Sequence, residues 1–131
     1  MNFNSKDFNI DESAIDRELC QLGSKMFEYG QEEGKLKVGL EQAKSNLEFT
    51  EAVVDTDIRF KAKTEGTKKT EVQLKNEILL SDLYKSALVK YEDAQKNYNL
   101  VKAAMVALSA KRDCLIALSY RDRQLMKADV Y

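Results

Sequence analysis

The side chains of this sequence that are best suited to chemistry form one short basic stretch, Arg59-Phe60-Lys61-Ala62-Lys63, followed by Lys68 and Lys69. Cationic groups pair with the phosphates of a nucleic acid, and a ring between them offers a stacking face to an unpaired base. The stretch is therefore typical of binding to single-stranded nucleic acid. Two other interpretations stay open, because basic residues also complement the carboxyl end of a helix and Phe60 also suits an apolar core.

Residues for catalysis are scarce. The chain contains no histidine, which removes the commonest general base and the commonest metal ligand. The adjacent acids Glu32-Glu33 and Glu92-Asp93 project to different helix faces, so neither pair forms a carboxylate dyad. We find no glycine-rich phosphate loop, no zinc-ligand spacing and no Ser/His/Asp set. We therefore expect a protein that is not an enzyme and that uses no metal or other cofactor.

The elements that position the basic stretch are predicted to be helices. The 131 residues suffice for one domain, and they include no proline and only five glycines. Proline breaks a helix by removing a donor and clashing with the preceding turn, so its absence favours long uninterrupted helices. With 44% hydrophobic and 33% charged residues, the chain is too apolar for plain disorder and too charged for a membrane span.

The sequence predicts a cytoplasmic protein that makes no use of a membrane. No stretch approaches the roughly 20 consecutive apolar residues that a bilayer crossing needs. Residues 1–11 hold no apolar run of a secretory signal. Cys20 and Cys114 are far apart in the sequence and lie in apolar-periodic segments, so we expect both thiols to be reduced and buried in the core.

A long helical segment is expected over residues 13–63, after a flexible N-terminus of residues 1–12. Asp11 and Ser13 are rival N-caps for it. Twelve positions, ten of them apolar, follow at alternating spacings of four and three; we call them the N-terminal seam: Ile15, Leu19, Leu22, Met26, Tyr29, Glu33, Leu36, Leu40, Ala43, Leu47, Thr50 and Val54. The mean spacing of 3.5 keeps one helix face towards a partner in a left-handed supercoil.

Four glycines interrupt this segment, at positions 23, 30, 34 and 39. Each costs a helix about 1 kcal/mol relative to alanine. We expect the helix to bend or break near Gly30 to Gly34, in preference to running straight. A third interpretation is that the glycines let a neighbouring helix approach closely.

The second half of the chain is predicted to be a basic loop over residues 64–69 and helices over residues 70–127. Thr70-Glu71-Val72-Gln73 has the form of a capping box and should open a short helix that ends near Leu80. Ser81-Asp82 either caps a new helix or lies within a continuing one. A second apolar stripe then follows at spacings of three and four: Tyr84, Ala87, Tyr91, Ala94, Tyr98, Val101, Met105 and Leu108. Arg112 interrupts this stripe after Leu108, and Leu115 continues it.

These patterns predict an all-α fold of one helical domain over residues 1–131, in which long helices form an extended hairpin or coiled-coil-like bundle. The N-terminal seam, together with the part of the second stripe from Tyr84 to Tyr98, covers more helix face than one thin hairpin can bury. Exposed stripes of this size usually mark an interface. We therefore expect a homo-oligomer, with closed rotational symmetry favoured over an open filament.

Charge is distributed unevenly along the chain, although the net charge is only −1. Residues 1–58 carry a net −7, residues 59–75 a net +4 and residues 76–131 a net +2. The sequence leaves open whether a second, C-terminal basic cluster joins the first: Lys111, Arg112, Arg121 and Arg123.

A pattern across most of the chain indicates a family. The long N-terminal segment ends in Lys61-Ala62-Lys63, a short glycine-containing loop leads to Lys69-Thr70-Glu71, and the later helices end in a basic cap at Lys111-Arg112. In this order of features the sequence resembles the phage UvsY-type recombination mediators. The family pattern has Arg where this chain has Lys63, a change that keeps the charge and loses the fork geometry, and Ser where it has Thr70. The loop is also short here, and the family's aromatic residues in the last helix are not matched one for one.

The resemblance implies a small all-helical protein that forms a ring-like homo-oligomer and binds single-stranded DNA. It would help to load a strand-exchange recombinase onto DNA covered by single-strand-binding protein, in the recombination, repair and replication of DNA in a phage-infected bacterial host. Lys61 and Lys63 are the DNA contacts carried over from the family. Charge and proximity add Arg59, Lys68 and Lys69.

A competing interpretation is a non-enzymatic coiled-coil adaptor or virion structural protein with no role in binding nucleic acid. The same helices and seams would serve it, and the basic stretch would be a solvated turn. Titration of the protein with a labelled single-stranded oligonucleotide at two salt concentrations separates the two interpretations.

Overall fold

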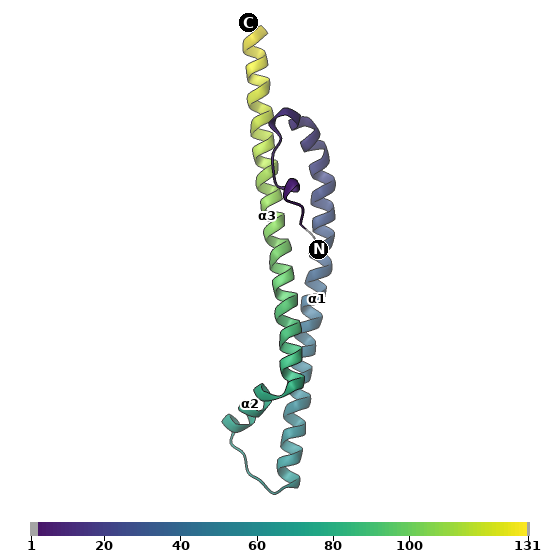
Figure 1. Cartoon of the computed structure of the whole chain (residues 1–131), viewed down its shortest axis with the longest axis vertical. Coiled ribbons are helices and arrows are strands. Elements are labelled where there is room, and N and C mark those ends of the chain that lie inside the picture. The colour runs from purple at the N-terminus through teal and green to yellow at the C-terminus, as the bar shows by residue number, and fades with distance from the viewer. Residues whose placement is uncertain (1–2, 131) are drawn as a thin grey trace. The chain divides into compact units, whose positions relative to one another are not determined.

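The chain folds into helices joined by short connections, as a computed structural model that describes residues 3–130 shows (Figure 1). Three α-helices follow two 3-10 turns, Ser5–Asp7 and Glu12–Ala14: α1 spans Ile15–Thr64, α2 spans Glu71–Leu80 and α3 spans Asp82–Val130. No β-strand occurs between residues 3 and 130. The predicted all-α class is confirmed.

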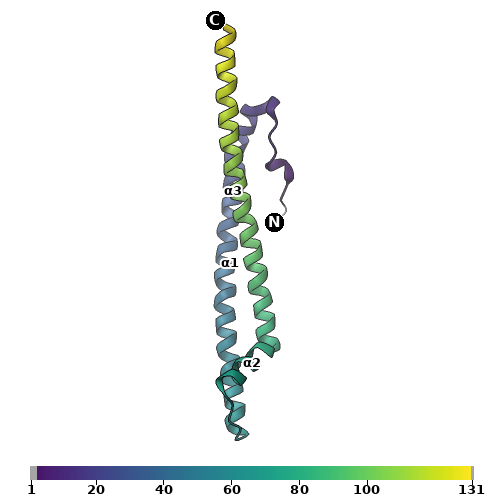
Figure 2. The same ribbon diagram turned by 90° about the vertical axis from the view of Figure 1, so that its left-hand side faces the viewer.

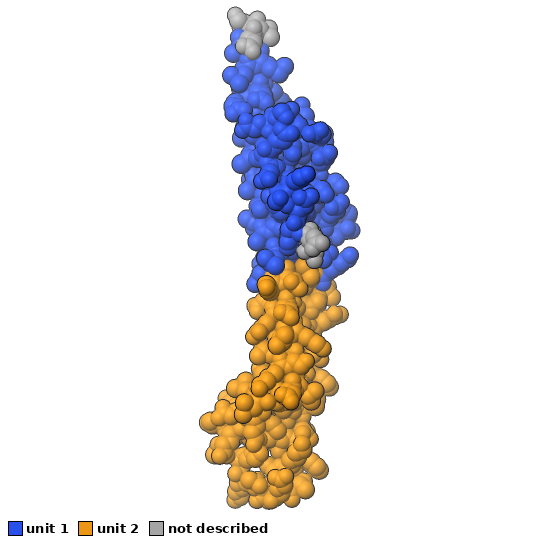
Figure 3. Space-filling view, in the orientation of Figure 1, with its two compact units in different colours: residues 1–35, 99–131 blue, residues 36–98 orange. Residues whose placement is uncertain are grey.

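Contacts within the chain gather in two compact units (Figure 3). Unit 1 comprises Met1–Lys35 and Asn99–Tyr131, and unit 2 comprises Leu36–Tyr98. Each unit contains a part of α1 beside a part of α3, and unit 2 also contains α2 (Figures 1 and 2). The assignment of residues 1–131 to a single domain stays a prediction.

The N-terminal seam lies on the inner face of α1. All twelve of its positions are buried or half-buried, including the polar Glu33 and Thr50. The second stripe behaves in the same way on α3, where Ala87, Val101 and Leu108 are buried. Packing within the chain therefore accounts for most of the apolar face that had suggested a homo-oligomer.

The N-terminal segment of unit 1 packs on the helices from Phe3 onwards, where the sequence predicted flexibility over residues 1–12. The rings of Phe3 and Phe8 lie 6.0 Å and 5.9 Å from the ring of Tyr29, centroid to centroid. The Tyr29 hydroxyl donates a hydrogen bond of 2.8 Å to Asp7 Oδ2. Aromatic contacts and a buried hydroxyl thus hold this segment against α1.

Helix α1 is continuous through its glycines, so of the bend or break expected near Gly30 to Gly34 the break is absent. A Cβ placed on Gly23, Gly30, Gly34 or Gly39 would meet nothing within 4 Å in the described structure. Close approach of a neighbouring helix within the chain is therefore not the reason for these glycines. Buried seam residues on both sides, such as Leu22 and Val54, hold the weak stretch in helical form.

The turn from α1 to α2 has well-defined ends. Gly66 has a φ of +68°, and the amide of Thr67 donates to the carbonyl of Ala62 at 2.9 Å, as in a Schellman cap. Thr70 and Gln73 exchange the two hydrogen bonds of a capping box, which confirms the predicted start of α2. Ser81 ends α2, and α3 begins as a new helix at Asp82.

Both cysteines are free and exposed, where the sequence predicted core positions. Cys20 follows the seam residue Leu19, and Cys114 precedes the buried Leu115. One residue turns a helix by about 100°, so each thiol lies to the side of the apolar face rather than on it.

Of the helices described, none combines the length and the apolar character that a membrane crossing requires.

Candidate nucleic-acid interface

The five predicted DNA contacts all lie in unit 2, at the end of α1 and in the loop that follows it. Arg59, Lys61 and Lys63 belong to the last turns of α1, while Lys68 and Lys69 lie between the helix end and α2. The glycine cap at Gly66 reverses the chain between the two groups. The fold therefore brings both halves of the basic cluster into one region.

Arg59 is held by carboxylates from two helices. Its Nε lies 3.0 Å from Asp55 Oδ1, one turn earlier on α1, and its Nη2 lies 3.1 Å from Glu71 Oε2, in the first turn of α2. Hydrogen bonds to Glu71 and Asp55 raise the pKa of the Arg59 guanidinium. The guanidinium thus ties α2 to α1, and its charge is already compensated.

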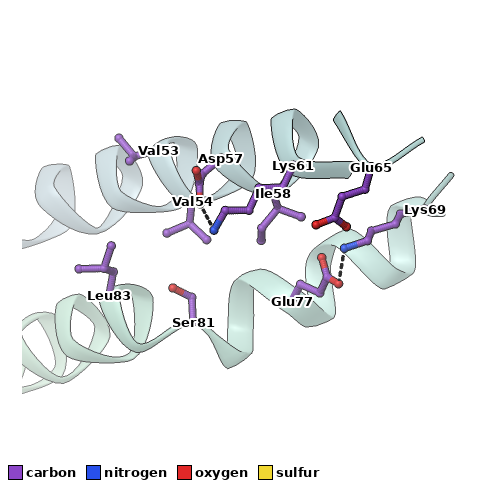
Figure 4. A pocket seen from close by; sticks show the side chains of 10 residues that line it. All are labelled: Val53, Val54, Asp57, Ile58, Lys61, Glu65, Lys69, Glu77, Ser81 and Leu83. Atoms are coloured by element: carbon purple, nitrogen blue, oxygen red, sulfur yellow. Dashed lines mark hydrogen bonds and ion pairs between the residues drawn. The ribbon is translucent and has the colours of Figure 1, made fainter. Parts of the chain in front are cut away.

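Two of the lysines are also paired. Lys61 Nζ lies 3.2 Å from Asp57 Oδ2, and Lys69 Nζ lies 2.6 Å from Glu77 Oε1 (Figure 4). The first pair joins successive turns of α1, and the second joins the loop to α2. A phosphate would have to compete with these carboxylates for both ammonium groups.

Lys63 and Lys68 are the cations of the cluster that remain available. Both side chains are exposed, and neither forms an ion pair with another residue in the described part of the chain. They stand on either side of the cap at Gly66, one on the last turn of α1 and one in the loop. A phosphate can approach either ammonium group without displacing a carboxylate.

Three acids that sequence reasoning left out of the cluster reduce its net charge: Asp55, Asp57 and Glu77. Asp55 and Asp57 stand four residues before Arg59 and Lys61, a spacing that predicts ion pairs on a helix. That signal was therefore present in the sequence. The pairing of Lys69 with Glu77 depends on the path of the loop and had no such signal.

A cavity of about 490 Å³ adjoins the cluster in unit 2. Figure 4 shows its apolar side chains, including Val54, Ile58 and Leu83, on helices that face each other. Lys61 and Lys69 line it together with Asp57, Glu65 and Glu77, so its charged groups are predominantly acidic. This composition does not favour a phosphate inside the cavity.

The C-terminal basic cluster belongs to unit 1, and one of its residues, Lys111, is not accessible to a ligand. Lys111 is buried, with its ammonium 2.7 Å from Glu18 Oε2. Arg112 and Arg121 lie 3.6 Å from Asp113 and Asp122 respectively. Lys111 therefore serves the packing of unit 1 and is not a candidate contact for DNA.

Among the residues that the structure describes, no group of His, Cys, Asp and Glu side chains is arranged to hold a metal ion. Comparison of the chain with protein-family models, with curated proteins and with solved structures finds no match.

Proposed function

We propose that this protein is a non-enzymatic, single-stranded DNA-binding protein and that DNA binds at the end of α1 and the loop after it. The observation that carries the proposal is the exposure of Lys63 and Lys68 without carboxylate partners. Phosphate contacts of this kind are insensitive to base sequence and sensitive to salt. Arg59, Lys61 and Lys69 are already paired with carboxylates. They contribute to phosphate binding only through the cationic groups of those ion pairs.

The biological role that we propose is that of a recombination mediator, which loads a strand-exchange recombinase onto DNA covered by single-strand-binding protein. Its support is the resemblance to the UvsY-type family at Lys61-Ala62-Lys63 and Lys69-Thr70-Glu71. Arg59, two residues before the first motif, forms an ion pair with Glu71, the last residue of the second motif. The motif residues thus share one local structure.

We further propose that the protein acts as a homo-oligomer with ring symmetry. Two available lysines per chain make a weak site, whereas a ring that repeats them gains affinity through avidity. Exposed apolar side chains at the junction of α2 and α3 offer a contact surface, since Leu79, Leu80 and Leu83 are 54%, 69% and 66% exposed. Binding of DNA should therefore depend on assembly.

The test is a fluorescence-anisotropy titration of a labelled single-stranded oligonucleotide at several salt concentrations. Lys63→Ala combined with Lys68→Ala should weaken binding and reduce the slope of log affinity against log salt by about 1.4 for each protomer in contact. Lys37→Ala with Lys44→Ala is the matched control, because both lysines are exposed on α1 in unit 2 and the loss of charge is equal. Equal weakening by both double variants would mean that the site is wrong.

A second candidate function has one observation in its favour. Carboxylates neutralise Arg59, Lys61 and Lys69, which is the arrangement of a solvated, structural turn. A coiled-coil adaptor or virion structural protein would need no more than this. Failure of the wild-type protein to bind single strands at low salt would establish this candidate over the DNA-binding proposal.

A further inference from the structure

The ring of Phe60 is exposed to solvent on α1, three residues before the available Lys63. It is 68% exposed, although the residues two positions before and after it, Ile58 and Ala62, are half-buried and buried. Two residues turn a helix by about 200°, so Phe60 faces away from the side of α1 that packs in unit 2. Within this chain the ring is therefore not a core residue.

The surroundings of the ring combine a flat apolar face with positive charge. Lys63 stands three residues later, on the same side of α1, and is exposed without an ion pair among the described residues. Asp57, one turn earlier, is already paired with Lys61. A ligand that carries an aromatic face next to an anionic group would fit this surface, because the ring and the ammonium can be contacted together.

We propose that Phe60 stacks on an unpaired base of the bound strand while Lys63 contacts the adjacent phosphate. This inference rests on the proposed single-stranded DNA binding and assigns a base contact to the same site. Bases are available for stacking in a single strand, whereas a duplex already stacks them internally. The contact tolerates any sequence, because every base presents a π-face, and it makes the site selective for single strands over duplexes.

A second phenylalanine supplies an unusually close control. Phe49 is also 68% exposed, and it lies eleven residues before Phe60, which is about three full turns of the same helix. It therefore shares the face of α1 on which Phe60 lies. Its neighbours one turn away carry no charge, and Glu48 adjoins it in the sequence. Of these two phenylalanines, Phe60 is the one whose exposed ring stands one turn from an available cation.

Tryptophan substitutions give a direct readout of stacking. The chain contains no tryptophan, so Phe60→Trp and Phe49→Trp each introduce a single indole fluorophore. An unlabelled single-stranded oligonucleotide should quench the fluorescence of Phe60→Trp at saturation and leave that of Phe49→Trp unchanged. An oligonucleotide of the same length made of abasic sites should quench neither. Equal quenching of both variants, or none in Phe60→Trp at saturation, would overturn the proposal.

Affinity provides the second measurement. Phe60→Ala should weaken binding of the normal strand by at least about fivefold and leave binding of the abasic strand unchanged. Phe49→Ala, the control, should change the binding of neither strand. Sedimentation of Phe60→Ala should match that of the wild type. A lowered oligomer mass would instead identify the ring as a contact between protein copies and overturn the stacking assignment.

The outcomes separate this inference from the function on which it rests. If the wild type binds single strands and Phe60→Ala binds both the normal and the abasic strand as well as the wild type does, stacking is wrong and the DNA-binding proposal stands. If Phe60→Ala weakens both strands equally, the ring acts on the phosphate contacts and stacking is again wrong. If the wild type binds neither strand at low salt, both proposals fail together.

Discussion

The ammonium of Lys111 lies 2.7 Å from Glu18 Oε2 and donates a 2.8 Å hydrogen bond to the backbone carbonyl of Asp7. One buried side chain of α3 thereby joins α1 and the N-terminal segment within unit 1. Lys111 stands three residues after Leu108 and four before Leu115, both fully buried, so it occupies the inward position of the stripe. The aliphatic stem packs where an apolar residue would, and the charge reaches partners beyond it.

Lys111→Met should destabilise the protein by about 2–4 kcal/mol in denaturant unfolding. The variant keeps an unbranched side chain that is one atom shorter, but it leaves the half-buried Glu18 carboxylate and the Asp7 carbonyl without their donor. Lys90→Met is the control, since Lys90 is exposed on α3 and should change stability by less than about 0.5 kcal/mol.

Replacing both members of the Lys111 pair should cost less than replacing one. Lys111→Met with Glu18→Leu removes the unpaired carboxylate, so the double variant should be more stable than Lys111→Met alone. A single variant as stable as the wild type would show that the ion pair makes no contribution to folding.

Tyr29 should titrate at unusually high pH. Burial, together with the hydrogen bond to Asp7, raises the pKa of Tyr29 to about 12 from the ordinary value of 10.0. The raised pKa means that the folded state favours the protonated phenol. Its contribution to stability is therefore fully present below about pH 10 and is lost as the pH rises through about 12.

Tyrosinate absorbance measures this titration without interference, because the chain has no tryptophan. One tyrosine should titrate near pH 12 in the wild type and be missing in Tyr29→Phe. The difference in unfolding free energy between the two proteins, about 1 kcal/mol near neutral pH, should shrink over the same alkaline range. A wild-type titration with no component in that range would contradict the packing of the N-terminal segment.

Replacing a glycine by alanine should have opposite effects on stability in α1 and in the loop. Gly34→Ala should stabilise the helix by up to about 1 kcal/mol, since the added Cβ meets nothing within 4 Å. Gly66→Ala should destabilise the protein by about 1–2 kcal/mol, because the φ of +68° is unfavourable for any residue with a Cβ. Thermal unfolding of both variants checks the pair, and the same sign for both would contradict the turn geometry.

The sequence predicted the helices well because their signals are local and repeat many times. The spacing of the N-terminal seam and the Thr70 capping box each depend on residues within one or two turns, and both are present as expected. The glycines do not break α1 at Gly30 to Gly34, since buried residues before and after them outweigh a cost of about 1 kcal/mol each.

The candidate site was less predictable because its electrostatics depend on tertiary contacts. Counting charges along the sequence treated Arg59 and Lys69 as free cations, whereas the turn brings Glu71 and Glu77 to them. The interruption of the second stripe was assigned to Arg112, but Lys111 takes the inward position. A pattern of apolar residues locates a helix face to within one residue, and that residue decides which charge is buried.

Assembly should depend on the exposed leucines at the junction of α2 and α3 rather than on the N-terminal seam. Leu40, for example, is half-buried within unit 2, so a charge there would damage the fold itself. Leu80→Asp combined with Leu83→Asp places two charges on side chains that are 69% and 66% exposed. These charges should weaken a contact between copies while leaving the helices intact, because neither leucine is part of the core.

Sedimentation velocity at tens of micromolar, together with circular dichroism, checks this assembly prediction. We expect an oligomer for the wild type, a smaller species for the leucine double variant and the same helix content for both. Val106→Asp is the control, since Val106 is 71% exposed on the part of α3 that belongs to unit 1. An effect of Val106→Asp alone would move the contact to unit 1, and a monomeric wild type would refute the homo-oligomer and, with it, the gain in DNA affinity through avidity.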